Sequence, residues 1–594
     1  MTSSRVRRAL LAISVAGLAL IGGLGYVFWR VLPPVIPAVA ATPMHARPFK
    51  GVPVLPSVLP RPSLAGVRAA VLVEPENIRL TGPGEYDAAT AHWRTWLRDA
   101  GAQLVAADTA DVLVAPQAQC LGPIQRRLIA KHLARGGGLI TTGPVGAYDG
   151  LCKPLPDTLI SSLLGIKDSD IRAAPRRQND AHYAVVLGET VLGAHLPPGP
   201  RLEFNPNYQI VFRTPTREML YCDYERNPMN AGMPYFDAAA MRALVGPGRV
   251  VAFGFSPVDL VGDWSQSVGH VILGNAVRWA SGRTMFQVAP WPNGHKAAAV
   301  LSQDVEGDYK NARIALDALE PYGLPGTAFI VGKLAEGDPE TTRRLIEKME
   351  IGTHTYNHEP LDTLPPKLQT AELVTSKHVA EQLAGKPVTG FRPPEERFTT
   401  RTLQDWADLG GTYVFVNNNM RSAGPEIIPV LPDSLVMLGR ISEDDFELLE
   451  RDKLRDRKKM SERIVSQVSE SVAYRGLYMF SYHSHMFSQK ELVPVLQSLA
   501  EKLKKTPEVW TTTAGQVAEW WRSRSYVVIK YGADGRTVTL TNRGPRPFAE
   551  GQLIVDGVNG ERSIVPLPVI QPGASVRADA SGRITAEPLV GQAN

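Results

Sequence analysis

A chain of 594 residues is longer than one hydrophobic core usually organises, so it predicts several domains. Its hydrophobic fraction of 44% and charged fraction of 21% are those of a globular protein, which excludes wholesale disorder. The formal net charge of +5 includes Arg5, Arg7, Arg8 and Arg30 beside an N-terminal apolar run. The remainder is nearly neutral and gives no support for nucleic-acid binding.

Residues 1–32 contain an almost wholly apolar run, Ala9 to Trp29, behind three arginines. About 20 apolar residues are enough for a helix to cross a bilayer, and positive charge on the short side keeps that side cytoplasmic. We therefore expect an inner-membrane signal anchor, with the bulk of the chain exported to the periplasm or cell surface. A cleaved signal peptide is the alternative, because Ala38-Val39-Ala40 resembles a cleavage site. The protein would then be secreted.

Residues 33–64 are rich in Pro, Ala and Val, which favours extended conformations and predicts a semi-rigid linker. The segment 65–290 then alternates strand and helix signals. Strands are predicted at Val67 to Pro75, Ala110 to Pro116 and Gly138 to Gly143, with helices at Ala88 to Ala100 and Pro123 to Arg135. This alternation predicts an α/β domain with a mostly parallel sheet covered on both faces.

The pattern LVAP followed by GGGLITTGP, with GRVVAFGFSPVD (Gly248 to Asp259) as a closing strand, resembles the class I glutamine-amidotransferase-like fold. The nucleophile of that family lies on a sharp strand-to-helix elbow between small residues. The segment PQAQCLGPIQ around Cys120 lacks this pattern, and no His-Glu partner motif is evident. The resemblance therefore implies a non-catalytic domain, used for scaffolding or glycan binding.

The three cysteines, Cys120, Cys152 and Cys222, are too few for a disulfide scaffold. In an oxidising compartment one pair can still form. Cys120 and Cys152 each follow one of two neighbouring predicted strands, so they are the candidate pair. Buried free thiols are the alternative.

A second α/β domain is predicted at 296–523. Strands at Ala297 to Asp304 and Gly326 to Gly332 each precede a helix, at Asn311 to Glu320 and Pro339 to Met349. Further strands are predicted in VTGFRPP, GTYVFVN, LYMFSYHSH and VWTTT, and this number of units suits a distorted (β/α) barrel. Residues 526–594 show only short alternating runs between Gly, Asn and Pro, which predicts a small β-sandwich.

Polar, metal-competent side chains follow three strands of the second domain. The first strand is followed by Asp304, Glu306 and Asp308, a short strand by His354 and His358, and a third strand ends in His483 and His485. Sites in such barrels assemble at the carboxyl ends of strands, so we expect one common site.

Two histidines four apart can face the same way on one helical turn. His354 and His358 can then bind one zinc ion, with a carboxylate as the third protein ligand. The open position would hold a water whose pKa the metal lowers towards ~7. A carboxylate that is not a ligand can act as general base, and a histidine across the site as general acid.

The order Asp-x-Glu, His-x-x-x-His, Arg-Pro-Pro and strand-end His resembles the polysaccharide deacetylase family, the chitin and peptidoglycan deacetylase esterases, over residues 296–523. The resemblance implies that His354 and His358 bind Zn²⁺ or another divalent cation such as Co²⁺. Glu306 would be the third ligand, with Asp308 as the alternative.

The same resemblance implies the catalytic groups. Asp304 would be the general base, and Arg392 in GFRPPEERF would orient it. His483 would protonate the departing amine, with His485 as the other candidate.

The sequence departs from the family pattern at several points. The commoner first motif has two adjacent aspartates, whereas here Val305 separates them and the second is a glutamate. The third motif lacks its usual glycine and contains Glu395 and Glu396. A clear match to the family's Asp-Trp motif is missing, although Asp405-Trp406 lies in the right region. Trp510 and Trp520 either line the end of the site or belong to the core.

The predicted function is metal-dependent removal of N-acetyl groups from amino sugars of an extracytoplasmic polysaccharide or peptidoglycan. Two alternatives remain. A glycan-binding or assembly protein with a degraded site would suit the altered motifs. A small-amide amidohydrolase could use the same fold, although a small metabolite needs no surface tethering.

Overall fold

The computed structural model describes residues 59–587, apart from 61–62, 82, 167–181, 205–209, 211, 213, 215, 223–237, 259, 417–423, 431–432 and 440–441. The predicted anchor at 1–32 and most of the predicted linker at 33–64 lie outside these residues. Within the described part of the chain, no helix has both the length and the apolar character needed to span a membrane.

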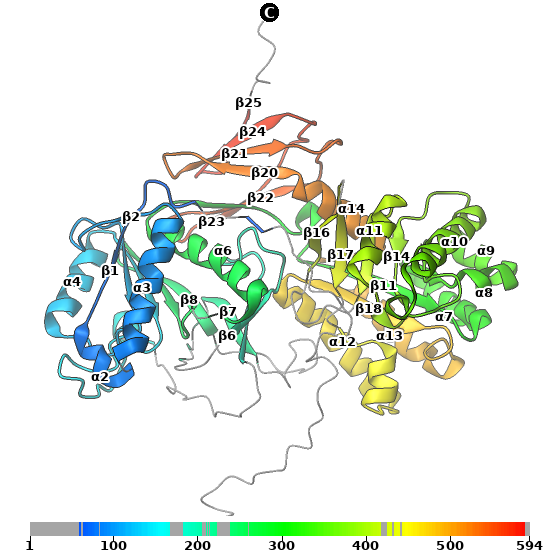
Figure 1. Cartoon of the computed structure of the whole chain (residues 1–594), viewed down its shortest axis with the longest axis horizontal. Helices are drawn as coiled ribbons and strands as arrows, with labels where there is room; N and C mark the ends of the chain where they lie inside the picture. The colour runs from blue at the N-terminus through cyan, green and yellow to red at the C-terminus, as the bar shows by residue number, and fades with distance from the viewer. Residues whose placement is uncertain are drawn as a thin grey trace, which may run out of the picture. The chain divides into compact units, whose positions relative to one another are not determined.

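The first nine-stranded sheet has the order β2-β1-β3-β4-β9-β8-β7-β5-β6. Its strands are β1 (Arg68–Val71), β2 (Gln103–Leu104), β3 (Val112–Pro116), β4 (Gly138–Thr142), β5 (His182–Val186), β6 (Arg201–Phe204), β7 (Arg217–Cys222), β8 (Ala238–Val245) and β9 (Gly248–Phe253). The associated helices are α2 (Ile78–Thr81), α3 (Pro83–Asp99), α4 (Pro123–Ala134), α5 (Leu159–Leu164) and α6 (Gly262–Ala280). Figure 1 shows this part in blue to green.

The expectation of a mostly parallel first sheet was wrong. Neighbours among β2, β1, β3, β4 and β9 pair in parallel. Beyond β9, the strands β8, β7, β5 and β6 add an antiparallel half to the sheet. The β-α alternation that predicts parallel pairing covers only the first half. Beyond it, β8 and β9 are joined by a short turn at residues 246–247, which permits only antiparallel pairing.

The disulfide between Cys120 and Cys152 is confirmed. The two residues follow β3 and β4, which are parallel neighbours, so their Cα atoms lie 5.0 Å apart. Cys152 has a positive φ of 59° in the loop that returns towards Cys120. Cys120 is therefore not a free thiol.

The second nine-stranded sheet has the order β16-β17-β15-β14-β13-β12-β11-β18, with β19 also paired to β11. Its strands are β11 (Ala297–Val305), β12 (Thr327–Ile330), β13 (Glu350–Thr353), β14 (Gly390–Phe391), β15 (Tyr413–Val416), β16 (Glu426–Val430), β17 (Asp433–Gly439), β18 (Leu477–His483) and β19 (Val509–Thr512). All pairings except β16 with β17 are parallel. The sheet curls into a half-barrel within a mixed α/β fold.

Helices flank this second sheet, as Figure 1 shows in green to orange. They are α7 (Ala312–Leu319), α8 (Gly332–Gly337), α9 (Pro339–Lys348), α10 (Pro366–Ala384), α11 (Thr400–Asp408), α12 (Arg457–Tyr474), α13 (Val493–Lys504) and α14 (Ala514–Ser525). The start of α9 shows how the sequence sets a helix boundary. Asp338 caps it by accepting from the Thr341 N–H at 3.1 Å, and Pro339 occupies the first helical position.

Strand β11 lies between β12 and β18 in the half-barrel and is buried along its whole length. Its apolar start, AAAVL, suits a parallel strand covered on both faces. The polar end of the same strand therefore brings Asp304 into a buried position, and that residue is fully buried.

Two smaller sheets include the C-terminal strands. One contains β10 (Met285–Val288), β22 (Gln552–Asp556) and β23 (Arg562–Pro566), and the other β20 (Val527–Tyr531), β21 (Thr537–Asn542), β24 (Ser575–Asp579) and β25 (Ile584–Glu587). Residues of both sheets share one apolar cluster. Sequence alone assigned β10 to the end of the first domain, whereas it pairs with β22. Trp520 belongs to the same cluster and the partly buried Trp510 packs against it, which agrees with the core interpretation of these two residues.

Candidate active site

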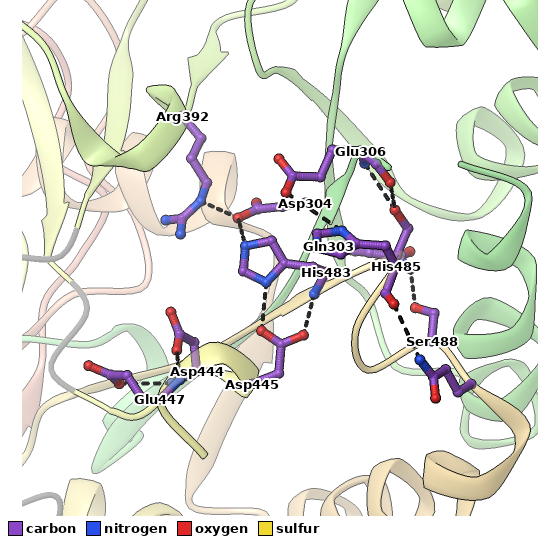
Figure 2. A network of polar contacts seen from close by, with 12 residues as sticks. Gln303, Asp304, Glu306, Arg392, Asp444, Asp445, Glu447, His483, His485 and Ser488 are labelled. Atoms are coloured by element: carbon purple, nitrogen blue, oxygen red, sulfur yellow. Dashed lines mark hydrogen bonds and ion pairs between the residues drawn. The ribbon is translucent and has the colours of Figure 1, made fainter. Parts of the chain in front are cut away.

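The carboxyl ends of β11, β13, β14 and β18 carry the predicted site residues. Asp304 lies one residue before the end of β11. Arg392 follows β14 directly, and its Nε donates to Asp304 Oδ2 at 2.5 Å (Figure 2). The guanidinium carbon also lies 4.3 Å from the centre of the Phe415 ring. Contacts on two sides therefore hold Arg392 in place. Arg392 in turn fixes the orientation of the Asp304 carboxylate.

His483 ends β18 and faces Asp304. The register of β11 and β18 pairs these two residues, and His483 Nε2 lies 3.6 Å from Asp304 Oδ2. On the other side of the ring, Nδ1–H donates to Asp445 Oδ1 at 2.6 Å. The His483 backbone N–H donates to Asp445 Oδ2, also at 2.6 Å, so one buried carboxylate holds both groups (Figure 2).

The electrostatics of this pair suit a proton donor. Burial alone would lower the pKa of His483, but Asp445, followed by Asp304 and Glu306, outweighs burial and raises the pKa to about 10. His483 is therefore protonated at neutral pH, with its Nε2–H on the side of Asp304. A protonated histidine and a carboxylate thus lie 3.6 Å apart, which suits them to act as general acid and general base on one substrate.

His354 and His358 lie in the loop after β13, so the expected helical turn was wrong. Thr355 and His358 have positive φ values of 64° and 66°, which are incompatible with a helix. Glu372 on α10 holds the loop by accepting from two of its backbone N–H groups, at 3.0 and 2.9 Å. The loop still brings the two histidines together, and their Nε2 atoms are 3.2 Å apart.

Glu306 completes a cluster with these two histidines. Its Oε2 lies 3.1 Å from His354 Nε2 and also contacts His358 Nε2. One donor atom from each residue lies within 4.8 Å of the other two. His354 Nδ1–H donates to the Arg392 carbonyl oxygen at 2.7 Å, which leaves Nε2 available as a ligand. Two imidazoles and one carboxylate are a donor set of catalytic zinc sites, so these residues fit a divalent cation.

The pKa shifts of Glu306 and His358 arise from contacts within the cluster. Burial alone would raise the pKa of Glu306, but hydrogen bonds from His354 and His358 outweigh burial and lower it. Burial would likewise lower the pKa of His358, but Glu306 raises it. Glu306 is therefore kept as an ionised carboxylate, which is the form that binds a cation.

The alternatives left open by the sequence differ in position. Asp308 is exposed at the start of a short 3₁₀ turn (Tyr309–Asn311) and lies outside the cluster that contains Glu306. His485 lies beside Glu306, with Nδ1 3.7 Å from Oε1. The structure thus pairs Asp304 with His483, and Glu306 with His485.

Asp405-Trp406, in the region of the family's Asp-Trp motif, has a packing role in this structure. Asp405 on α11 accepts from Thr370 Oγ1 at 2.6 Å, and Trp406 is fully buried, donating from Nε1 to the Tyr413 carbonyl at 3.1 Å. These contacts bind α11 to its neighbours, away from His483. The carboxylate behind the histidine is Asp445.

Asp445 and Ser484 are the two site residues that sequence reasoning missed. Asp445 stands in the acidic run SEDD, which reads as a solvated loop, and it lies 38 residues before His483. Ser484, between the two strand-end histidines, bonds the backbone of Glu306. The sequence signal for Ser484 was its place directly after the predicted strand that ends in His483, whereas Asp445 carried no such signal.

Glu395 and Glu396, in the altered third motif, have positive φ values of 51° and 57°. Glu396 is buried, and its Oε1 lies 3.3 Å from Arg392 Nη2. The departure from the family pattern thus adds a second carboxylate beside the arginine that holds Asp304.

Residues 295–414 match the family model of polysaccharide deacetylases. This part of the chain is therefore a polysaccharide deacetylase domain, a domain of a family of hydrolases. The chain is 28% identical over 114 residues to the peptidoglycan-N-acetylglucosamine deacetylase of Bacillus cereus, a match that covers 19% of this chain and 41% of that protein. The chain thus spans about two fifths of the length of this curated relative.

Two solved structures are also similar. One is a probable polysaccharide deacetylase from Pseudomonas aeruginosa, 14% identical, with 39% of this chain and 93% of that chain covered and a TM-score of 0.36. The other is the Puue allantoinase, 16% identical, with 39% of this chain and 92% of that chain covered and a TM-score of 0.36.

Proposed function

We propose that residues 296–523 hydrolyse N-acetyl groups on amino-sugar units of an extracytoplasmic polysaccharide or peptidoglycan. The observation that carries this proposal is the pairing of Asp304 with His483 beside the Glu306–His354–His358 cluster. The family match supports the reaction class. The Bacillus cereus relative, named as a peptidoglycan deacetylase, supports the substrate class.

In the proposed reaction, Asp304 accepts a proton from the water that attacks the acetyl carbonyl carbon, and Arg392 keeps the carboxylate aimed at that water. His483 then gives its Nε2 proton to the departing nitrogen as the carbon–nitrogen bond breaks. Asp445 holds the ring and stabilises its positive charge. The products are acetate and a free amine.

A divalent cation such as Zn²⁺ would be held by Glu306, His354 and His358. When bound, it would polarise the acetyl carbonyl and lower the pKa of the attacking water. The remaining chemistry belongs to the chain's own residues. Both halves of the acid–base machinery, with their positioning partners Arg392 and Asp445, are present, which supports an enzyme over a glycan-binding protein with a degraded site.

The test is acetate release from N-acetylated glycans by the purified protein, before and after metal removal and after restoring Zn²⁺ or Co²⁺. We expect activity to disappear with the metal and to return with it. Activity unaffected by thorough chelation would contradict the metal site. Hydrolysis of small amides such as allantoin, followed by loss of the substrate because no acetate is produced, tests the small-amide alternative.

We also propose that the chain is exported and remains anchored by residues 1–32. The Cys120–Cys152 disulfide supports this location, because cytosolic thiols are kept reduced. The same bond supports a non-catalytic role for the first sheet, whose resemblance to glutamine amidotransferases would otherwise need a free nucleophilic thiol. Membrane fractionation with a C-terminal tag tests the anchor: a protein found wholly in the soluble fraction would exclude it.

A further inference from the structure

The two oxygens of the Glu306 carboxylate have different neighbours. Oε2 faces His354 and His358, whereas Oε1 faces His485 Nδ1 at 3.7 Å. That nitrogen is shielded from solvent and has no hydrogen-bond partner in the described part of the chain. The His485 side chain as a whole is 37% exposed, so only its outer edge reaches solvent. Its inner edge is thus directed at the carboxylate of the proposed metal ligand.

Ser484 holds the backbone of the same glutamate. The Glu306 N–H donates to Ser484 Oγ at 3.0 Å, and the hydroxyl donates to the Glu306 carbonyl oxygen. The Ser484 N–H in turn donates to the Asp304 carbonyl at 3.0 Å. Ser484, directly after β18, therefore holds the end of β11 by hydrogen bonds on both sides of Val305.

Gly307 provides the room that His485 needs. Its φ is +54°, and a Cβ atom at this position would lie 2.8 Å from His485 Cβ and 2.9 Å from His485 Nδ1. Both distances are too short for a normal contact. A side chain at position 307 would therefore displace His485 from Glu306.

We propose that His485 and Ser484 are positioning residues that hold Glu306 in the geometry for metal binding. A glutamate has one more rotatable bond than an aspartate, so its carboxylate loses more freedom when fixed. Ser484 holds the backbone of Glu306, and His485 lies against its carboxylate. Less conformational freedom therefore remains to be lost when the ion binds. Groups that orient metal ligands in this way are typically worth about 10–100-fold in metal affinity.

As a positioning residue for Glu306, His485 has a role different from that of a general acid. The acid position is held by His483, which contacts Asp304 and Asp445. His485 contacts neither of these groups in the described structure, and its nearest carboxylate is Glu306. This inference rests on the proposed metal site, and its test uses metal affinity without substrate.

The experiment measures the Kd of Zn²⁺ by competition with a chromophoric chelator. We expect His485→Ala to weaken binding about 10–100-fold. His485→Asn, whose amide nitrogen can occupy the place of Nδ1, should stay within about threefold of the wild type, which a merely space-filling role would not predict. His378→Ala removes an exposed histidine on α10 and is the matched control.

Gly307→Ala approaches the same contact from the other side and should also weaken Zn²⁺ binding. In a His485→Gly background it should weaken Zn²⁺ binding much less, because glycine lacks both the ring and the Cβ that lies 2.8 Å away, while the strain of alanine at positive φ is present in both backgrounds. Wild-type Zn²⁺ affinity in His485→Ala, or an asparagine variant no better than alanine, would overturn the proposal.

His354→Ala separates this proposal from the metal site itself. If His354→Ala loses Zn²⁺ and His485→Ala does not, only the positioning role fails. If His354→Ala binds Zn²⁺ like the wild type, the proposed metal site and the inference fail together.

Discussion

Asp445→Asn is the substitution that tests the acid half of the site most selectively. The native carboxylate accepts two hydrogen bonds of 2.6 Å from one residue, His483. An amide offers one acceptor oxygen, so either the His483 backbone N–H or the ring Nδ1–H loses its acceptor. The positive imidazolium also loses its principal counter-charge. We therefore expect the pKa of His483 to fall from about 10 towards or below its ordinary value of 6.5.

The sign and size of the effect follow from the protonation state. A proton donor is active below its pKa, so lowering the pKa removes activity as the pH rises through the new value. At pH 7.5 a histidine with a pKa near 6.5 is about one-tenth protonated, which costs about tenfold. Loss of ring orientation adds to this, and the combined decrease in kcat should be about 10²–10³, within the range of general acid catalysis.

The assay is the initial rate of acetate release at saturating glycan from pH 6 to 10. The alkaline limb of the kcat profile should move to lower pH in Asp445→Asn. Asp405→Asn makes the same chemical change at a carboxylate that bonds Thr370, and it should leave the profile in place. An Asp445→Asn enzyme with an unchanged alkaline limb and kcat within threefold of the wild type would refute the reasoning.

Three further results are expected. Arg392→Lys should lower kcat about 10–100-fold, because an ammonium cannot reproduce the Nε donation to Asp304; an unchanged kcat would remove Arg392 from the mechanism. His354→Ala should lower bound zinc, measured by elemental analysis, from near one per chain to background, whereas retained stoichiometric zinc would place the ion elsewhere. Cys120→Ser with Cys152→Ser should lower the free energy of unfolding by roughly 2–4 kcal/mol in denaturant titrations. The unreduced wild type should show a single reactive thiol, Cys222, after denaturation, whereas three reactive thiols would exclude the Cys120–Cys152 disulfide.

Local patterns predicted the strands and helices of the half-barrel closely. The run AAAVLSQD gave β11, because a continuous apolar run ending in acidic residues suits a buried strand that reaches a site. The helix at Pro339 was predicted because proline and a preceding aspartate mark a helix start. The pair Cys120 and Cys152 was identified because both follow strands expected to be neighbours.

What the sequence predicted wrongly or left open depended on contacts between distant segments. The antiparallel half of the first sheet and the pairing of β10 with β22 are settled by tertiary packing, which strand periodicity does not encode. The choice between Glu306 and Asp308 depends on backbone direction after β11, where one further turn exposes Asp308. Asp445 carries no spacing signal towards His483, so only the folded structure reveals it.

The central claim is that Asp304 and His483 together remove acetyl groups from an amino-sugar polymer. The most direct measurement is paired quantification of acetate and new free amines from a panel of N-acetylated glycans, using zinc-loaded wild type, Asp304→Asn and His483→Ala. The account predicts equal amounts of acetate and amine from at least one glycan with the wild type, and losses of at least about 10²-fold in each variant. No acetate from any glycan with the zinc-loaded wild type, or equal rates in the variants, would contradict it.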